Sequence, residues 1–445
     1  LIFQNTNMTS DLPDPDIYRN WGRFSEHAKK TLEERDHLFQ VANIKHSQII
    51  KLNEAGINTL KELATSDTKV HNVDKRVLDR LRLQAVMQNQ AKEKGGIPYS
   101  LLSNVEIGLG LSSLPPKSEL DIYFDIESNP LLTKIPLHYL WSAAHGDNAE
   151  GFDCWWAHSE EEMKTTFEDF IDWTYARWQQ DNAMHVYHYG QFEITAIREL
   201  MGHFGTRERE VDSLLRNEVF VDLYRVVKQS LCIGAEGYGL KAIEPLFREE
   251  RDNEVSSGQD STVVYEIWSS ERGDTKDHTD SEYLKEIWDY NKDDCISLIS
   301  LSDWLRGIQE KEGISYFFKA SKEREVERID ASNLLDELVR GLSQQDKKPH
   351  ARILANLCLY HKRESKPAYW RLFDRLESTD EELVDDLDCL GDLVATAEIE
   401  EITTKSSAYT FSFDPNQETK IKRGDSVRVK QDTNINVTVH EMNSS

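Results

Sequence analysis

Asp121–Glu127 has the sequence DIYFDIE, and its β-branched and aromatic residues are typical of a buried β-strand. Side chains two residues apart on a strand point to the same face, so Asp125 and Glu127 should project together among apolar neighbours. Two such carboxylates repel each other and lose hydration unless a cation lies between them. The stretch therefore predicts a core strand with a divalent-cation site, although an exposed edge strand with two solvated acids fits the same pattern.

A further acidic residue follows a second predicted strand, His185–Tyr187. The chain passes through Gly190, and Glu193 then opens a predicted helix over residues 193–204. A carboxylate at that point lies at the C-terminal end of a strand, where sites collect in open α/β sheets. The alternative is an acid that only stabilises the dipole of the following helix.

Two more candidates lie on a predicted helix over residues 281–307. Tyr290 and Asp294 are one helical turn apart and share a face. Apolar residues of this helix form a stripe that should be buried, and Asp294 lies near it. An acid in that position needs a partner, for which a metal ion would serve. An ordinary amphipathic helix with an acidic patch is the alternative.

These segments follow the order D-x-E, H-x-x-x-F-E and Y-x-x-x-D along the chain. In that order they resemble the three exonuclease motifs of the DEDD superfamily, in its tyrosine-bearing branch. With FVDLY at 220–224, YGLK at 238–241 and YNxxDC at 290–295, residues 40–310 are similar to YprB-type ribonuclease H-like domains. Such domains occur in large proteins between a RecB-like nuclease and a superfamily-one helicase. His361–Trp370 is similar to the connector that leads into that helicase.

The resemblance implies a nuclease that works with two Mg²⁺ or Mn²⁺ ions held by Asp125, Glu127, Glu193 and Asp294. Tyr290 would orient the attacking water, and nucleotides would be released from a 3′ end of DNA or RNA. The second motif of the superfamily usually ends in Asp, whereas here it ends in Glu193. If the departure impairs catalysis, the domain would instead be a nucleic-acid-binding scaffold that supports a helicase.

Two side chains near these motifs are candidate contacts to nucleic acid. His188 is expected to contact a phosphate or the water, or else to pack in the core. Lys241 is expected to contact a backbone phosphate, with a solvated lysine as the alternative. Asp222 is expected to orient Lys241 or to cap local structure rather than to bind metal.

A third candidate contact is Gly56, in a predicted helical hairpin. A helix over residues 45–52 should end near Gly56, and Asn58 or Thr59 should cap the next helix. This resembles a helix-hairpin-helix element, which grips phosphates through backbone N–H groups. A basic helix over residues 73–94 follows, and a plain helical hairpin with a solvated face remains the alternative.

The chain of 445 residues is too long for one ordinary core. We predict an α/β protein with a ribonuclease H-like mixed sheet flanked by helices. Four parts are expected, at residues 1–95 (helical, with the helix-hairpin-helix), 96–318 (exonuclease domain), 319–400 (helical connector) and 401–445 (β-rich start of a helicase-associated barrel). Further strands are expected at 135–144, 152–157, 409–413, 426–429 and 436–439, with a helix at 160–178 and a polar, turn-rich segment at 249–280.

Composition limits the remaining possibilities. The formal net charge of −27 argues against a protein that coats DNA, but not against a nuclease that holds cations through carboxylates. Long apolar runs, a signal peptide and a Walker phosphate loop are not found in the sequence, so we expect neither a membrane span nor ATP hydrolysis by such a loop. Five dispersed cysteines indicate reduced thiols and a cytoplasmic location. The first residue is Leu1, so we expect a longer or processed chain.

Overall fold

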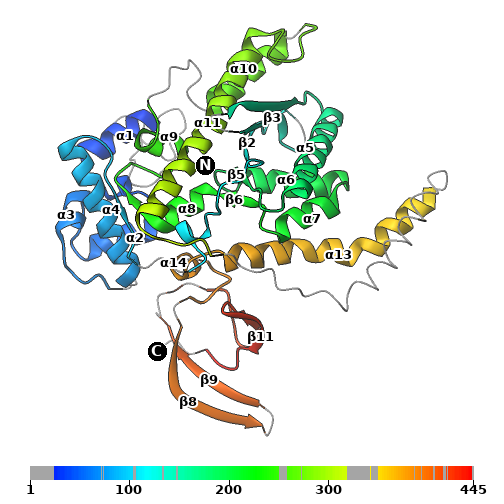
Figure 1. The fold of residues 1–445 in the computed structure, drawn as a ribbon. Coiled ribbons are helices and arrows are strands. Elements are labelled where there is room, and N and C mark those ends of the chain that lie inside the picture. Colours follow the sequence, from blue (N-terminus) through cyan, green and yellow to red (C-terminus); the bar gives the residue numbers. More distant parts are fainter. Residues whose placement is uncertain are drawn as a thin grey trace, which may run out of the picture. The chain divides into compact units, whose positions relative to one another are not determined.

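A computed structural model gives the fold of the chain (Figure 1). The residues it describes are 25–71, 73, 75–103, 107–132, 135–146, 149–249, 258–271, 273–317, 341, 349–384, 386–391, 393–403, 406–413, 417 and 419–442. Two compact units are distinguished, Leu1–Phe318 and Lys319–Ser445. None of the described helices is both long enough and apolar enough to span a membrane.

A mixed five-stranded sheet lies at the centre of the first unit, with the strand order β4-β3-β2-β5-β6. The strands are β2 (Ile122–Asn129), β3 (Leu137–His145), β4 (Gly151–Trp156), β5 (Val186–His188) and β6 (Phe220–Asp222). Strand β2 pairs antiparallel with β3 and parallel with β5. The predicted α/β class with a mixed sheet between helices is therefore confirmed.

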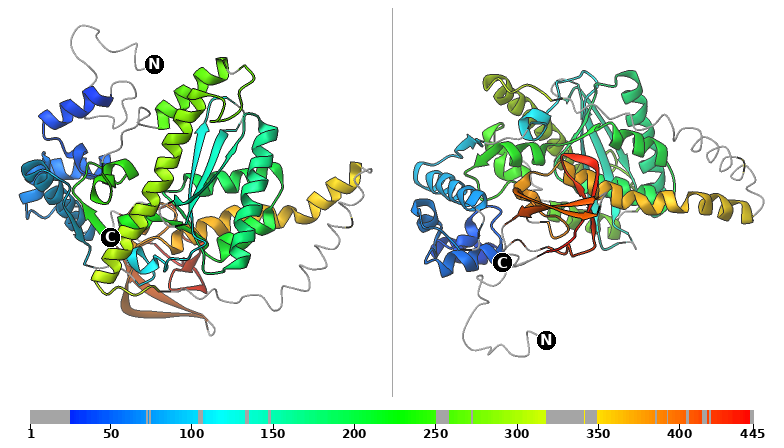
Figure 2. Two further views of the ribbon diagram at one scale, coloured as in Figure 1. Left: turned by 45° about the horizontal axis from the view of Figure 1, so that its top comes forward. Right: turned by 90° about the horizontal axis from the view of Figure 1, so that it is seen from below.

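Helices cover both faces of this sheet (Figure 2). Helix α11 (Glu282–Lys311) packs on one face, where Ser302 donates a hydrogen bond to the Tyr123 hydroxyl over 3.0 Å. Helix α5 (Glu160–Gln180) packs on the other face, where Phe170 stacks on Phe124 with 4.2 Å between ring centroids. Alternate residues of β2 thus serve two cores, which follows from the two-residue period of a strand. Asp125 and Glu127 share the α11 face with Tyr123.

The remaining elements of the unit surround this frame. They are α1 (Ser25–Glu34), α2 (His46–Glu54), α3 (Leu60–Thr65), α4 (Lys75–Lys94), β1 (Tyr99–Leu101), α6 (Phe192–Phe204), α7 (Glu208–Arg216), α8 (Leu223–Ser230), β7 (Leu231–Ile233), α9 (Leu240–Ile243) and α10 (Gly258–Glu271). Helices α2 to α4 enclose a separate small core around Leu52, Leu60 and Leu81. Helix α4 joins this core to β7, because Gln84 donates a hydrogen bond to the carbonyl of Ile233 over 2.7 Å.

Some local structure differs from the sequence expectation. Helix α10 occupies part of the segment 249–280 that we expected to be turn-rich. Its apolar residues face both ways, since Tyr265 and Trp268 are buried while Val263 is exposed, so no single helical stripe marks it in the sequence. The short strands β1, β6 and β7 were missed because each forms by pairing with a strand far away in the chain, β1 with β7 and β6 with β5, and local sequence does not show such pairing.

The second unit combines helices with two strand pairs. Its elements are α13 (Pro349–Leu376), α14 (Asp380–Val384), β8 (Val394–Thr403), β9 (Ser406–Ser412), β10 (Ser426–Val429) and β11 (Asp432–Thr438). Strand β8 pairs with β9 and β10 with β11, both antiparallel. The expected strands at 409–413, 426–429 and 436–439 fall on β9, β10 and β11. Strand β8 begins at Val394, where we expected helix up to residue 400, because its many β-branched residues favour a strand.

Candidate metal centre

Three of the predicted acidic residues meet over one face of β2. Asp125 and Glu127 come from β2, and Asp294 comes from α11. One carboxylate oxygen from each lies within 4.8 Å of the other two. Glu127 is only 6% exposed, while Asp125 and Asp294 are half-buried. The alternating faces of β2 and the position of α11 on that face therefore bring together side chains 169 residues apart in sequence.

The fourth predicted acid, Glu193, lies outside that group of three. It sits in the first turn of α6 and is 4% exposed. Its Oε2 is 3.6 Å from Nδ1 of His188, and no donor among the described residues gives that oxygen a hydrogen bond. His188 is also buried, with Nδ1 2.8 Å from the carbonyl oxygen of Gly190. His188 thus adjoins Glu193 in the core at the edge of the cluster.

Two neutral side chains that the sequence did not indicate hold the cluster in place. The amide of Asn291 donates a hydrogen bond to Oδ2 of Asp125 over 2.6 Å. The hydroxyl of Ser261, on α10, donates to Oε2 of Glu127 over 2.8 Å and lies 2.6 Å from the hydroxyl of Tyr139. Asn291 belongs to the YNxxDC segment, so this motif could have indicated that Asn291 is part of the site. Ser261 lies in the segment that we expected to be turn-rich.

The electrostatics of the cluster favour a bound cation. Burial raises the pKa of Asp125 well above its usual range, and the charges of Asp294, Glu127 and Glu193 raise it further. Burial also raises the pKa of Glu127 to about 8, against the lowering effect of the Ser261 hydrogen bond. Carboxylates so crowded and desolvated need a positive partner. Oxygen ligands of this kind suit Mg²⁺ or Mn²⁺, and the buried Oε2 of Glu193 offers one more, so the residues fit a divalent ion.

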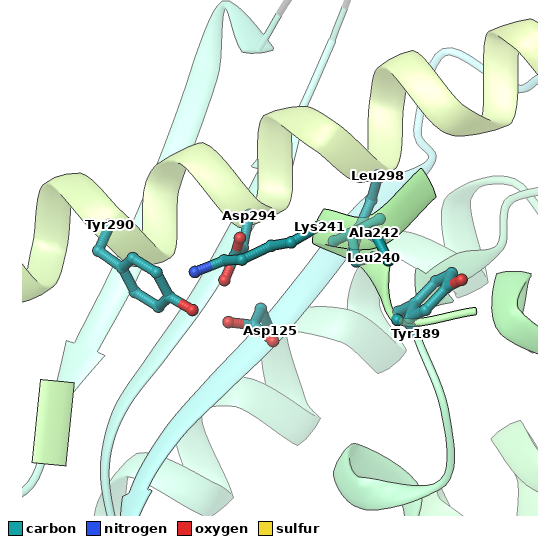
Figure 3. Close-up of a pocket in the computed structure, with 9 residues that line it drawn as sticks. Asp125, Tyr189, Leu240, Lys241, Ala242, Tyr290, Asp294 and Leu298 are labelled. Carbon is teal, nitrogen blue, oxygen red and sulfur yellow. The ribbon is translucent and has the colours of Figure 1, made fainter. Parts of the chain in front are cut away.

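A pocket of about 470 Å³ opens over the cluster. Its lining includes Asp125, Asp294 and Tyr290, together with Tyr189 and Lys241. Figure 3 shows the Lys241 side chain extending between Asp294 and Asp125 toward Tyr290. The Lys241 ammonium lies 4.0 Å from the centroid of the Tyr290 ring. The pocket therefore presents carboxylates, a phenol hydroxyl and an ammonium to the same space.

The Tyr290 hydroxyl is a neutral donor in this pocket. Burial raises its pKa strongly, and the negative charges of Asp294, Glu127 and Asp125 raise it further. Its side chain also hydrogen-bonds to Asp294, which favours the protonated phenol. A phenol held in this way can orient a water molecule or a phosphate oxygen, but it is a poor base.

Asp222 caps a helix beside the pocket. Its carboxylate accepts hydrogen bonds from the backbone N–H groups of Tyr224 and Arg225 at the start of α8, and from that of Gly190. The capping role that the sequence offered for Asp222 is therefore confirmed. By tying Gly190 to α8, this carboxylate also fixes the turn that leads into Glu193.

The predicted hairpin around Gly56 has the expected form. Helix α2 ends before Gly56, which has a φ of +80°, and the Thr59 side chain caps α3. However, each backbone N–H from Ala55 to Glu62 already has an acceptor within the chain, and the carboxylates of Glu62 and Asp36 receive three of these bonds. A phosphate would have to displace these acceptors. The role of Gly56 in binding nucleic acid stays a prediction, and its hydrogen bonding favours the plain hairpin.

Comparison with known families agrees with this geometry. Residues 122–306 match the family model RNase_H_2, described as RNase_H superfamily. The chain contains an RNase H-like domain. The matched span contains all five predicted catalytic residues as well as Lys241, Ser261 and Asn291. The match supports a hydrolase acting on nucleic acid as the general class of this domain. Comparison with curated proteins and with solved structures gave no match.

Proposed function

We propose that the RNase H-like domain is a metal-dependent exonuclease of the four-carboxylate type, which hydrolyses phosphodiester bonds at a 3′ end of DNA or RNA. The observation that supports this most is the convergence of Asp125, Glu127 and Asp294 beneath a pocket that also holds Tyr290. The 3′ polarity rests on the resemblance of the three motifs to the tyrosine-bearing branch of the DEDD superfamily.

In this proposal Asp125, Glu127 and Asp294 hold one cation, and Glu193 helps to hold a second. When bound, Mg²⁺ or Mn²⁺ ions supply activation of the attacking water and neutralise charge on the phosphate. The neutral hydroxyl of Tyr290 orients the water, and the Lys241 ammonium contacts a phosphate oxygen once a strand is bound.

Four further residues play supporting parts in this proposal. Asn291 and Ser261 keep the carboxylates in fixed orientations through their short hydrogen bonds. His188 positions Glu193 from the core side. The N–H of Gly56 would contact a phosphate in place of the Asn53 carbonyl, which accepts its hydrogen bond in the free protein.

A second candidate function is a nucleic-acid-binding scaffold with little catalysis. It is favoured by the place of Glu193, whose Oε2 lies beside His188 rather than within the group of three carboxylates. The longer side chain of Glu, where the superfamily usually has Asp, also changes where the carboxylate can reach.

One experiment separates these two functions. The 445-residue chain is incubated with Mn²⁺ and single-stranded DNA or RNA labelled at the 5′ or the 3′ end, for wild type, Asp125→Asn, Asp294→Asn and Asp289→Asn. Asp289 lies on α11 as Asp294 does, but pairs with Lys285 at 2.6 Å, so it is the matched control. We expect a 5′-labelled ladder and early release of the 3′ label by wild type and the control. If the two active-site variants cleave as well as wild type, the exonuclease proposal is wrong. If wild type shows Mn²⁺-dependent turnover that both variants lose, the scaffold proposal is wrong.

The wider setting is proposed from the sequence: the helicase module from the family resemblance, the cytoplasmic location from the dispersed cysteines, and the four parts from the patterns along the chain. We propose that a helicase module belongs to the same full-length protein, that the protein is cytoplasmic, and that the chain has the four parts described from its sequence. Peptide mapping of the protein isolated from its native cells, together with cell fractionation, tests the first two proposals. Limited proteolysis tests the third through cleavage near residues 95, 318 and 400.

A further inference from the structure

The ammonium of Lys241 lies beside the carboxylate cluster, in the pocket that Asp125 and Asp294 line. Lys241 lines the same pocket as Asp125 and Asp294, and its side chain reaches between them (Figure 3). Its Nζ is 4.0 Å from the centroid of the Tyr290 ring. Its positive charge also lowers the pKa of Glu127, against the dominant effect of burial. The carboxylate cluster therefore already has a cation beside it, and that cation belongs to the chain.

The backbone that carries Lys241 is fixed on both sides. Before α9, the Tyr238 hydroxyl donates to Oε1 of Gln84 over 2.8 Å, and the Tyr238 carbonyl accepts a hydrogen bond from Tyr189. After α9, Arg248 pairs with Asp293 of α11 at 2.5 Å. These contacts tie the segment to helix α4 on one side and to α11 on the other. The ammonium can therefore leave the cluster by rotation of the lysine side chain, without movement of α9.

We propose that Lys241 is an internal counter-cation of the carboxylate cluster, which a divalent ion must displace in order to bind. This rests on the proposed function, because it assumes that the cluster holds metal. Two cations that need the same carboxylate oxygens compete for them, and each repels the other at short range. A lysine ammonium on its four-carbon stem is well suited to move aside. Once displaced, it remains at the mouth of the pocket, where a nucleic-acid phosphate would meet it.

The effect of Lys241 on metal affinity can be measured without an activity assay. If Lys241 competes with the metal, loss of its charge should tighten metal binding in the absence of nucleic acid. If Lys241 only supports the site structurally, its loss should leave metal binding unchanged or weaken it. The two interpretations therefore predict different results, tighter metal binding in the first case and equal or weaker binding in the second.

The test measures Mn²⁺ binding to the 445-residue chain by titration calorimetry and by electron paramagnetic resonance of free Mn²⁺, with no nucleic acid present. The variants are Lys241→Met, Lys241→Arg and the control Lys285→Met. Lys285 is exposed on α11 and pairs with Asp289, so its loss changes net charge equally outside the pocket. We expect Lys241→Met to bind Mn²⁺ on the order of tenfold more tightly than wild type. Lys241→Arg and Lys285→Met should stay within about twofold of wild type, since the first keeps the charge and the second is screened by solvent.

The possible outcomes separate the two proposals. Saturable Mn²⁺ binding by wild type with equal or weaker binding by Lys241→Met overturns the counter-cation inference and leaves the proposed function standing. An equal gain in the Lys285→Met control also overturns it, because net charge would then explain the effect. Mn²⁺ binding absent from both wild type and Lys241→Met overturns both proposals. The rise in melting temperature with added Mn²⁺ gives a second readout, and it confirms that each variant is folded.

Discussion

The side-chain amide of Asn291 donates a hydrogen bond to Asp125 over 2.6 Å and so joins helix α11 to strand β2 inside the carboxylate cluster. Asn291 is fully buried, and its hydrogen bonding also lowers the pKa of Glu127 against the dominant effect of burial. A neutral donor at this position stabilises ionised carboxylates without adding a charge of its own. Asn291 is therefore a partner of the acidic residues rather than a candidate ligand.

We expect Asn291→Asp to destabilise the fold when no metal is present, because it adds a carboxylate to an already crowded group and removes a donor. The free energy of unfolding in EDTA at pH 7.5 should fall by about 3 kcal/mol, the usual cost of an unpaired buried charge. Urea denaturation measures it. Asn217→Asp is the control, since Asn217 is exposed at the end of α7 and should change stability by less than about 0.5 kcal/mol. Similar losses in the two variants would contradict the role given to Asn291.

Glu127 should make the metal-free protein less stable as pH rises. Burial raises the folded pKa of Glu127 to about 8, above its unfolded value, so the ionised form is disfavoured in the native state. The stability linked to its proton is present below the unfolded pKa and is lost as pH rises through about 8. In EDTA, Glu127→Gln should therefore be more stable than wild type at pH 8.5, by roughly 2 kcal/mol, with little difference at pH 4.5.

Added Mn²⁺ should reverse this order, because wild type gains stability from the bound ion and Glu127→Gln gains less. Thermal melting at both pH values, with EDTA or Mn²⁺, measures the four combinations. Glu266→Gln is the control, since Glu266 accepts a hydrogen bond from Asn129 at 3.1 Å outside the cluster. A Glu127→Gln variant that is less stable than wild type in EDTA at pH 8.5 would show that burial of this carboxylate carries no cost.

The sequence was sufficient to place the elements that carry most of the site. Asp125 and Glu127 share a face because a strand has a two-residue period, and Asp294 is near a buried stripe because a helix has a 3.6-residue period. Both periods are local, so they are visible before folding. The structure accordingly brings these three carboxylates together.

Contacts set by tertiary packing were not visible in the sequence. Ser261 reaches Glu127 across 134 residues, from a helix whose apolar residues point in several directions. The distance between Glu193 and the other acids depends on how α6 leaves the sheet, and no local pattern encodes that angle. The position of Lys241 between Asp294 and Asp125 likewise depends on the contacts that fix α9 to α4 and α11. These contacts join residues far apart in the sequence, and they determine the orientation and the pKa of the carboxylates.

The stability contributed by a buried ion pair beside the start of β2 should also depend on pH. Arg306 of α11 lies 3.6 Å from Asp121 and donates a hydrogen bond to the Tyr187 hydroxyl over 2.8 Å. Burial raises the pKa of Asp121 to about 6, although backbone hydrogen bonds and the guanidinium of Arg306 oppose the rise. Without that guanidinium the pKa of Asp121 should rise further, so the native state would favour its protonated form.

Arg306→Met should therefore lower the free energy of unfolding by about 3 kcal/mol at pH 8, where Asp121 is left as an unpaired buried charge. The loss should be smaller at pH 5, where Asp121 takes up a proton and its folded pKa, raised above the unfolded value, favours the native state. Urea denaturation at the two pH values tests this. Lys117→Met is the control, because Lys117 makes an exposed pair with Asp303 at 3.7 Å and should contribute less than about 0.5 kcal/mol. A pH-independent loss in Arg306→Met would contradict the linkage to Asp121.

His138 should make the fold sensitive to acid. It is 2% exposed on β3, its ring packs edge-on against Trp141, and its Nδ1 has no hydrogen-bond partner in the described part of the chain. Burial lowers its pKa from 6.5 to about 4, so the ring is neutral in the native state and takes up a proton more readily on unfolding. For a depressed pKa, the linked stability is present above the unfolded pKa and is lost as pH falls toward the folded pKa.

Phe at position 138 cannot titrate. We therefore expect the free energy of unfolding of His138→Phe, relative to that of wild type, to increase by about 2 kcal/mol as pH falls from 7.5 to 5. The difference between variant and wild type is the quantity to compare, because the many acidic groups titrate equally in both proteins and cancel. His203→Phe is the control for replacing a histidine ring by a phenyl ring, since His203 is exposed on α6 rather than buried. If the His138→Phe difference stays flat over this range, the imidazole is charged or solvated in the native state. Water would then reach the ring despite its packing against Trp141, and this part of β3 would not be a dry core.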